Sequence, residues 1–238
     1  MKIWNTKSGY RIIQILSGRS NVFLLTNGSK NILIDTSPNY MWGLLVKRLN
    51  TLHISKIDAL ILTHSHIDHV ENSCRIKKKY GSFIIIHRSE AAYLASGNNI
   101  IPHGTNLFTR TIMKALSSFI TPFLRYKPCQ YDVMVDDKFE LDDFGFSARI
   151  IHTPGHTIGS MSVVIDDEVA IVGDTMFGVF SGSVFPPYAD DIGEMLISWG
   201  KLLDTKCSVF IPGHGSANSR SLVQKDYDRR RKYHHIAG

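Results

Sequence analysis

One polar run directly after an apolar segment constrains the fold of this chain more than any other feature. The apolar run at 57–62 has the character of a buried strand, and it leads straight into His64-x-His66-x-Asp68-His69. A buried strand that ends in a polar cluster places that cluster at the edge of a sheet. His64 and His66 are two residues apart, so in an extended chain their side chains point the same way. Since imidazole and carboxylate groups bind zinc and iron, the run predicts a metal site.

Three later segments have the same design, because each puts a ligand-type residue just past a predicted strand and beside a glycine. They are Thr153-Pro154-Gly155-His156, Gly173-Asp174-Thr175 and Pro212-Gly213-His214-Gly215. Glycine lets the backbone bend sharply or approach closely at such a turn. Each segment alone is weak evidence, since a Pro-Gly-His turn is usually only a turn. Together with the first run they bring five His and two Asp to strand ends, which is enough to ligate two metal ions.

Length and composition are those of a globular chain of one large domain or two small ones, and we expect a single domain over residues 1–238. The 238 residues are 43% hydrophobic, and no Pro/Gly linker divides them. The three cysteines, Cys74, Cys129 and Cys207, are widely spaced and form no Cys-x-x-Cys pair, which favours reduced thiols. The sequence has neither a secretory apolar region nor an apolar run near the roughly 20 residues that span a bilayer. We therefore expect a cytoplasmic protein with no membrane partner.

Strand-like and helix-like segments alternate in two similar halves. In the first half we expect strands at 10–16, 21–27, 31–35, 57–62 and 82–87, and helices at 40–52, 71–80 and 89–95. In the second half we expect strands at 133–135, 138–141, 146–152, 160–166, 168–173 and 208–211, and helices at 192–203 and 219–234. Because each half runs from a β-rich part to strand–helix units, we predict two related halves packed face to face.

The alternation pauses at 96–132, where we expect a helical insertion. Apolar residues recur there at three- to four-residue spacing, as on one face of a helix. They are Phe108, Ile112, Leu116, Phe119, Ile120, Phe123 and Leu124. This face would pack on the rest of the domain or form a homodimer contact. Alternatively it would be a lid that gives an active-site cleft an apolar wall, with Phe119 and Phe123 against the substrate.

The ordered set of acids and histidines resembles the five motifs of the metallo-β-lactamase-fold hydrolases, over nearly the whole chain. The matching residues are Asp35, His64, His66, Asp68, His69, His156, Asp174 and His214. The resemblance implies an α/β fold, an αββα sandwich of two mixed β-sheets flanked by helices, with the site at one edge. It also implies that His64, His66 and His156 bind one ion. Asp68, His69 and His214 would bind a second ion, with Asp174 bridging both.

Details of this set narrow the type of site. The bridging residue is Asp174 rather than Cys, and both His64 and His66 are present. The site therefore resembles those of glyoxalase II, lactonases and ribonuclease Z more than those of the Cys-containing lactamases. It also departs from the flavo-diiron proteins, which have Glu in place of His66. Asp35, in the position of the first motif, would orient the histidine loop from behind; otherwise it is a capping acid.

Two divalent ions at such a site imply hydrolysis. Zinc is the expected ion, with iron or manganese as alternatives. A hydroxide bridging two ions is a nucleophile at neutral pH, because zinc lowers the pKa of bound water to about 7. Asp68 is the candidate catalytic residue, since it can ligate one ion while its other oxygen orients the hydroxide. Seven such side chains buried without metal would be an unsatisfied polar cluster.

Departures from the family patterns limit the substrate. Glyoxalase II implies a C-terminal helical domain, whereas only residues 215–238 follow His214. Lactonases of this fold carry Tyr three residues past the bridging Asp, where this chain has Phe177. The expected substrate wall after Asp174 comprises Phe177, Phe180, Phe185 and Tyr188. It suits a small, partly apolar carbonyl substrate: a thioester, lactone, β-lactam or ester.

Two other functions remain open. One is a metal-dependent phosphodiesterase or nuclease, which the basic tail favours: residues 220–238 hold six Lys or Arg and two Asp, or +4 of the formal net charge of +6. However, ribonuclease Z would imply a protruding RNA-binding arm, and the 96–132 segment is too apolar for one. A solvated helix end explains the tail, so the expected partner is a small molecule rather than nucleic acid. The other is an iron-containing oxygenase of the same fold.

Overall fold

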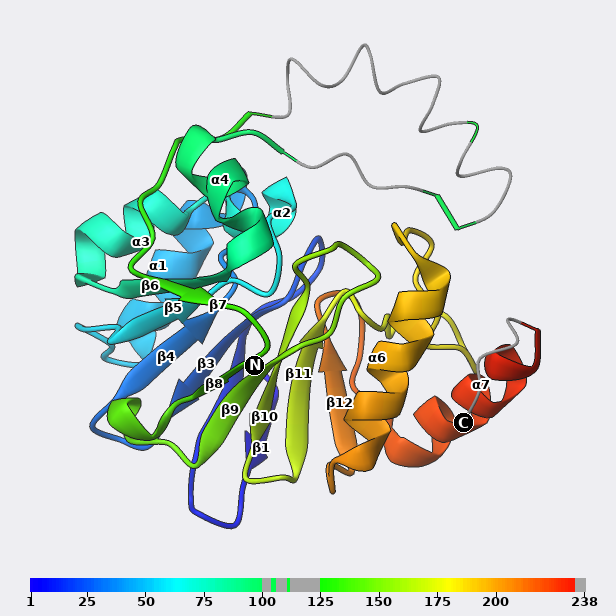
Figure 1. Cartoon of the computed structure of the whole chain (residues 1–238). Coiled ribbons are helices and arrows are strands. Elements are labelled where there is room, and N and C mark those ends of the chain that lie inside the picture. Colours follow the sequence, from blue (N-terminus) through cyan, green and yellow to red (C-terminus); the bar gives the residue numbers. More distant parts are fainter. Residues whose placement is uncertain (100–103, 106–110, 112–124, 234–238) are drawn as a thin grey trace.

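Two mixed β-sheets pack face to face and carry helices on their outer faces (Figure 1). The computed structural model describes residues 1–99, 104–105, 111 and 125–233. Within these residues the architecture confirms the expected α/β fold, an αββα sandwich of two mixed sheets flanked by helices.

The first sheet has seven described strands, which lie side by side in chain order. They are β1 (Ile3–Asn5), β2 (Arg11–Leu16), β3 (Val22–Thr26), β4 (Asn31–Ile34), β5 (Ala59–Ile61), β6 (Phe83–His87) and β7 (Val133–Val135). Neighbours are antiparallel from β1 to β4 and parallel from β4 to β7. The carboxyl ends of β4, β5 and β6 therefore lie at one edge of the sheet.

The second sheet has six described strands, in the order β13-β12-β11-β10-β9-β8. They are β8 (Lys138–Glu140), β9 (Ala148–His152), β10 (Met161–Ile165), β11 (Val169–Gly173), β12 (Val209–Pro212) and β13 (Asn218–Ser219). All neighbours are antiparallel except β11 and β12. Consequently β9, β11 and β12 run in the same direction, and their carboxyl ends share an edge.

Helices bury apolar side chains against both outer faces. The first sheet is covered by α1 (Trp42–Thr51), α3 (Ser73–Tyr80) and α4 (Arg88–Ser96), and the second by α6 (Ile192–Asp204) and α7 (Arg220–Tyr233). Shorter elements are α2 (Ile67–Val70) and the 3₁₀ turns η1 (Asn39–Met41) and η3 (Asp142–Phe144). Between the sheets lies a third core, which includes Phe23, Ile61 and Met161. Burying one such side chain contributes about 1.5–3 kcal/mol, so this core holds the two sheets and their edges together.

Outside the 96–132 segment, every predicted strand and helix occurs, with its ends within two residues of the prediction. The strands β1 and β13 were not predicted from the sequence. The first is a three-residue edge strand that is mostly exposed, and the second has only two residues, both polar. Neither has the buried apolar face from which a strand is recognised. Among the described residues, each helix is too short or too polar to cross a bilayer.

The apolar stripe of the expected insertion, including Phe119 and Phe123, lies outside the described residues. The helical insertion at 96–132, its role as a lid and the homodimer contact therefore stay predictions. The described ends of this stretch lie side by side, since Tyr126 N donates to Gly97 O at 3.0 Å. Gly97 has a φ of 71°, and a Cβ there would lie 2.2 Å from Tyr126 O. Only glycine therefore fits at this point, where the backbones of Gly97 and Tyr126 meet.

Candidate metal centre

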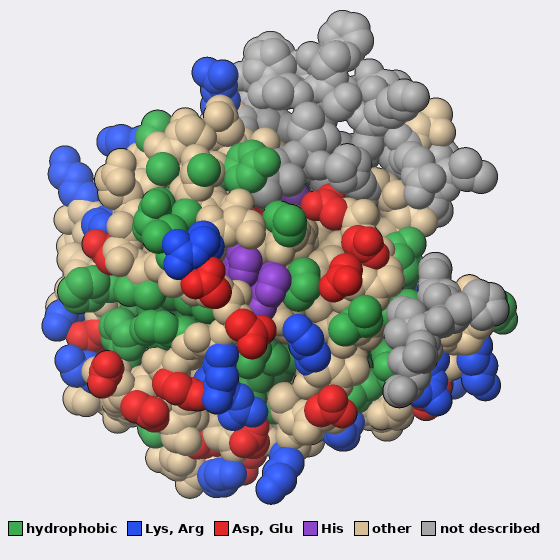
Figure 2. All heavy atoms as spheres, in the orientation of Figure 1, with side chains coloured by type: hydrophobic (Ala, Val, Ile, Leu, Met, Phe, Trp, Pro, Cys, Tyr) green, Lys and Arg blue, Asp and Glu red, His purple; other side chains and the backbone are tan. Residues whose placement is uncertain are grey.

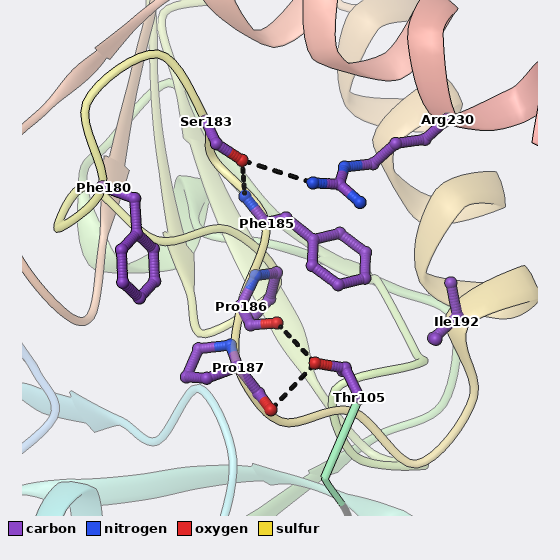
Figure 3. Close-up of a pocket in the computed structure, with 8 residues that line it drawn as sticks. All are labelled: Thr105, Phe180, Ser183, Phe185, Pro186, Pro187, Ile192 and Arg230. Atoms are coloured by element: carbon purple, nitrogen blue, oxygen red, sulfur yellow. Dashed lines mark hydrogen bonds between the residues drawn. The ribbon is translucent and has the colours of Figure 1, made fainter. Parts of the chain in front are cut away.

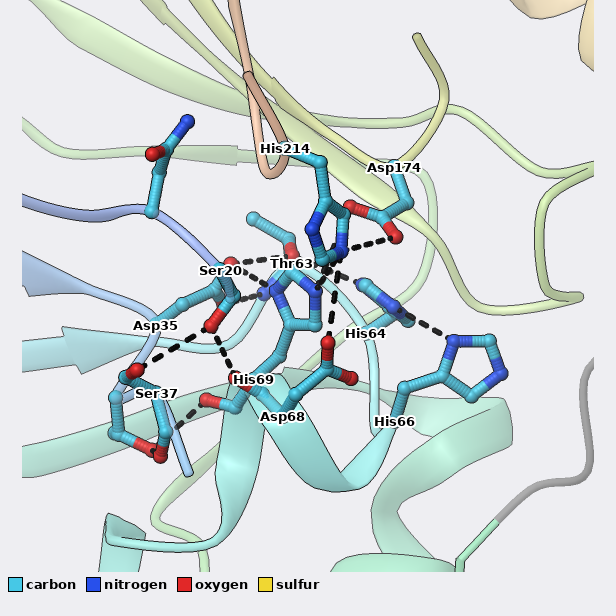
Figure 4. Close-up of polar contacts among 12 residues, drawn as sticks. Ser20, Asp35, Ser37, Thr63, His64, His66, Asp68, His69, Asp174 and His214 are labelled. Carbon is cyan, nitrogen blue, oxygen red and sulfur yellow. Dashed lines mark hydrogen bonds and ion pairs between the residues drawn. The ribbon is translucent and has the colours of Figure 1, made fainter. Parts of the chain in front are cut away.

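Loops at the carboxyl ends of β5, β9, β11 and β12 converge at one edge of the sandwich. They bring together every side chain that the sequence predicts as a metal ligand, and most of these are labelled in Figure 4. Figure 2 shows some histidine side chains at the surface of the molecule, beside acidic and hydrophobic side chains. Most of the ligand-type side chains are buried, whereas the side chains of Asp68 and His214 are each 16% exposed.

The first ligand group consists of His64, His66 and His156, which are all buried. His66 Nδ1 lies 3.0 Å from His64 Nε2 and 3.0 Å from His156 Nε2. His156 Nδ1 donates to Tyr188 O at 2.9 Å. His64 Nδ1 contacts Thr63 Oγ1 at 3.1 Å. If His64 and His156 carry their protons on Nδ1, their Nε2 lone pairs both face His66 Nδ1. One proton on His66 can serve only one of these lone pairs, so the arrangement suits a shared metal ion better than hydrogen bonding.

The second ligand group consists of Asp68, His69 and His214. His214 Nε2 lies 3.5 Å from Asp68 Oδ2 and 3.4 Å from His69 Nε2. Asp68 and His69 belong to the single helical turn α2, while His214 follows β12. A Cβ at Gly213 would lie 2.7 Å from His69 Cε1 and 2.3 Å from Asp174 Oδ1. The glycine before His214 is therefore needed for these side chains to meet.

Asp174 lies between the two groups. Its Oδ2 is 3.1 Å from His214 Nε2 and 3.6 Å from His156 Nε2, and its Oδ1 is 3.4 Å from His69 Nε2. Among the described residues, Oδ1 is buried and has no hydrogen-bond partner. A buried carboxylate oxygen without a partner is costly unless a cation binds it. The donor set therefore fits divalent metal ions.

A model of the metallo-beta-lactamase superfamily matches residues 17–214. The chain belongs to this superfamily. The matched range ends on His214, the last ligand-type residue, and includes all the others. Members of the superfamily typically bind metal ions, and the His and Asp groups of this chain can hold them. The protein is a metal-dependent hydrolase of the metallo-beta-lactamase superfamily.

Three relatives illustrate the range of hydrolases in the superfamily. The chain is 29% identical over 206 residues to a probable metallo-hydrolase of Methanocaldococcus jannaschii, covering 84% of this chain and 90% of the relative. It is 28% identical over 209 residues to a hydroxyacylglutathione hydrolase of Haemophilus influenzae, covering 86% and 90%. It is 24% identical over 234 residues to an atrochrysone carboxyl ACP thioesterase of Aspergillus fumigatus, covering 93% of this chain but 62% of that protein.

The fold is also similar to a solved structure. A metallo-beta-lactamase family protein from Thermus thermophilus aligns with a TM-score of 0.68 at 20% identity, covering 94% of this chain and 79% of the other. At this identity the likeness bears on the fold alone.

In this member of the superfamily, Asp35 contacts a ligand from behind. Its Oδ2 accepts a hydrogen bond from His69 Nδ1 at 2.8 Å, and its carboxylate accepts from Thr63 N and Thr63 Oγ1, each at 2.8 Å. A proton held on Nδ1 leaves His69 Nε2 free to bind a metal. Asp35 has a φ of 60°, a conformation that Asp adopts more readily than most residues. These hydrogen bonds have the geometry that the orienting role requires.

Two further residues support the ligand loops, and neither was predicted from the sequence. Asn21 donates three hydrogen bonds to carbonyl oxygens at 212, 213 and 215, on both sides of His214. Glu90 is fully buried and accepts hydrogen bonds from the loops that carry His64, His66 and His156. An Asn at the start of a strand and a Glu in the first turn of a helix are both ordinary, so neither gives a signal before the chain folds.

The pKa values of the histidines are shifted in opposite directions in the two ligand groups. Burial lowers the pKa of all three histidines in the first group, and for His64 and His66 the pKa falls well below the usual range. These rings are therefore held neutral, which is the form that binds metal. Burial instead raises the pKa of the nearby Glu90 carboxyl, against the hydrogen bonds that it accepts.

In the second group, the carboxylates reverse the effect of burial. Burial acts to lower the pKa of His69, but Asp174 and Asp35 raise it to about 10. The pKa of His214 is also raised, since Asp174 outweighs burial. Burial opposes ionisation of Asp174, yet His214 and His69 hold its pKa well below the usual range. The carboxylates thus concentrate negative charge at the place where metal ions would bind.

The predicted substrate-binding residues occupy two places. The Phe177 ring lies 4.8 Å from the His214 ring, and Tyr188 supports His156 through its carbonyl oxygen. Phe180 and Phe185 instead line a cavity of about 430 Å³ (Figure 3). Its other lining residues are Thr105, Ser183, Pro186, Pro187, Ile192 and Arg230. Pro187, which lines the cavity, directly precedes Tyr188, whose carbonyl oxygen accepts the hydrogen bond from His156. The cavity and the first ligand group are therefore connected through adjacent residues.

The basic tail is not uniformly solvated, in contrast to the sequence-based interpretation. The Arg230 guanidinium carbon lies 3.6 Å from the centre of the Phe185 ring, and its side chain is 23% exposed. Arg229 and Arg230 both pair with Asp226, and Arg231 pairs with Asp228. Three of the six basic side chains therefore pair with acids within α7, and one of these three, Arg230, also lines the cavity.

Proposed function

We propose that the protein hydrolyses thioesters at a site that holds two divalent metal ions. In this proposal His64, His66 and His156 hold one ion, Asp68, His69 and His214 hold the other, and Asp174 binds both. The observation that carries the proposal is the position of Asp174, whose carboxylate faces His156 of the first group at 3.6 Å and His69 and His214 of the second group at 3.4 Å and 3.1 Å. The names of two relatives, a hydroxyacylglutathione hydrolase and an ACP thioesterase, support the substrate class. Zinc is the proposed metal, with iron or manganese as alternatives.

Asp68 is the proposed catalytic residue. Bound metal ions would polarise the substrate carbonyl and lower the pKa of a bound water to about 7. Asp68 Oδ2 lies 3.5 Å from His214 Nε2, and its side chain is 16% exposed. One carboxylate oxygen can therefore serve as a ligand while the other accepts a hydrogen bond from the attacking water. Because Asp35 and Asn21 hold the ligand loops in place, little reorganisation is needed when the reaction begins.

The substrate would lie along the loop that follows Asp174. Phe177 and Tyr188 flank the histidines, and Phe180 and Phe185 offer an apolar cavity beyond them (Figure 3). An acyl or thiol arm of a thioester has the apolar character that this wall requires. Phe119 and Phe123 stay candidates for the opposite wall.

A substrate panel tests the proposal. Zinc-loaded protein is expected to hydrolyse thioesters, either a hydroxyacyl thioester of glutathione or an acyl N-acetylcysteamine thioester. We expect their kcat/KM to be roughly 100-fold above that for a β-lactam, a lactone or a phosphodiester, because a binding pocket discriminates between substrates on about this scale. Metal-stripped protein is the control and should be inactive until zinc is restored. Faster cleavage of the phosphodiester would favour the nuclease, and oxygen uptake by an iron-loaded protein would favour the oxygenase.

Phe185→Ala tests the cavity. We expect it to raise KM about tenfold for thioesters with a long apolar arm, because burial of such a ring contributes about 1.5–3 kcal/mol and 1.4 kcal/mol is tenfold in affinity. The kcat for a short acetyl thioester and the metal content should stay near the wild-type values. Phe83→Ala is the matched control, since Phe83 is 56% exposed on β6. Equal KM values in the two variants for every arm length would exclude the cavity from substrate binding.

A further inference from the structure

A buried carboxylate on α4 connects two ligand loops that are far apart in the sequence. Glu90 has no exposed surface. Its Oε2 accepts a hydrogen bond from Ser65 N, and its Oε1 accepts from Thr157 Oγ1 and, at 3.2 Å, from Gly159 N. Ser65 lies between His64 and His66, and Thr157 directly follows His156. One side chain thus joins the two loops that carry the first ligand group.

The surroundings of Glu90 are built for a carboxylate. Glu90 lies in the first turn of α4, where the helix dipole favours negative charge. A Cβ at Gly159 would lie 2.4 Å from Glu90 Cγ, so that position accommodates only glycine. Among the described residues, no Lys or Arg forms an ion pair with Glu90, so hydrogen-bond donors alone satisfy its oxygens. Burying a carboxylate costs free energy unless hydrogen bonds satisfy it, and here donors from two loops supply those hydrogen bonds.

We propose that Glu90 is a positioning residue that sets the geometry of the ion held by His64, His66 and His156. This inference rests on the metal-ligand roles proposed above. Zinc requires its nitrogens at about 2.0–2.1 Å, and a binding site must be held within about 0.5 Å of its productive geometry. The three ring nitrogens come from two loops, and Glu90 fixes the distance between those loops.

Glu90→Gln is the direct test, because it keeps the shape of the side chain and changes one acceptor into a donor. The Gln amide nitrogen would then face a backbone N–H, that of Ser65 or that of Gly159, and since both groups are donors at least one of these hydrogen bonds is lost. The Thr157 hydroxyl can accept instead of donate. We expect the dissociation constant of the zinc ion held by His64, His66 and His156 to rise about 10–100-fold, because this is the usual effect of removing a residue that supports a metal ligand. The dissociation constant of the second zinc ion should change less. Competition with a chromophoric chelator measures both constants without reference to activity.

Asp226→Asn is the matched control. Asp226 is also buried and holds a loop through a backbone N–H and a hydroxyl, at Val184 and Ser183. The Asp226→Asn variant should have a lower Tm and unchanged dissociation constants at both zinc sites. If Glu90→Gln behaves in the same way, Glu90 is merely structural and the inference is wrong.

A second pair of variants covers the case in which Glu90→Gln does not fold. Thr157→Val should raise the same dissociation constant, and Thr157→Ser, which keeps the hydroxyl, should restore it. Unchanged constants in Thr157→Val would overturn the inference. Wild-type protein that binds no zinc at all would instead sink the proposed function itself, so the two failures can be told apart.

Discussion

Asp174→Ala is expected to lower kcat/KM for a thioester by more than about a hundredfold, since removal of a residue behind a ligand already costs 10–100-fold. Asp174 faces His214, His156 and His69 at 3.1–3.6 Å, so its loss removes the group that the two ligand sets share. The metal content should fall below the roughly two ions per chain of a two-metal site. Steady-state kinetics and metal analysis by mass spectrometry after dialysis measure both effects.

Thr175→Val provides the control in the same turn. Thr175 Oγ1 contacts Thr153 rather than a ligand, and its carbonyl still accepts from Trp199 Nε1 after the substitution. Activity and metal content should therefore stay within a few-fold of wild type. If Asp174→Ala kept two ions and full activity, the shared-ligand arrangement would have to be abandoned.

The candidate ligands can be predicted from the sequence because their signals are local. His64 to His69 lie directly after an apolar strand, and each later ligand stands beside a glycine at a strand end. Both patterns are visible within a few residues. The parallel course of β9, β11 and β12 then brings those strand ends to one edge.

The supporting residues could not be predicted, because their partners are remote in the sequence. Asn21 donates to Pro212 O, 191 positions away, and Glu90 accepts from Gly159 N, 69 positions away. Arg230 is a similar case: within α7 it resembles any basic residue at a helix end, and only its contact with Phe185 places it in a cavity. Short-range patterns report on secondary structure and turns, whereas these roles arise from tertiary packing.

Asp35→Ala is expected to weaken metal binding at the second ligand group about 10–100-fold. Asp35 accepts a hydrogen bond from His69 Nδ1 at 2.8 Å, so when the imidazole loses one proton the proton on Nδ1 stays and Nε2 is free to act as a ligand. Without this acceptor the imidazole can carry its proton on Nε2, so a metal must compete with it. The pKa of His69 should also fall, because Asp35 is one of the carboxylates that raise it. Chelator competition gives the affinity, and ¹⁵N NMR of the imidazole gives the tautomer.

Asp58→Ala separates this effect from a loss of stability. Asp58 is a buried acid that pairs with Lys30 and Lys56. It lies just before β5, whereas the ligands follow the opposite end of that strand. Its removal should lower Tm but leave the His69 tautomer and the metal affinity unchanged. Asp35→Ala should change all three, because Thr63 N also loses its acceptor there. If the tautomer of His69 stays the same in Asp35→Ala while the affinity falls, Asp35 acts through the backbone of the histidine loop instead of through the imidazole.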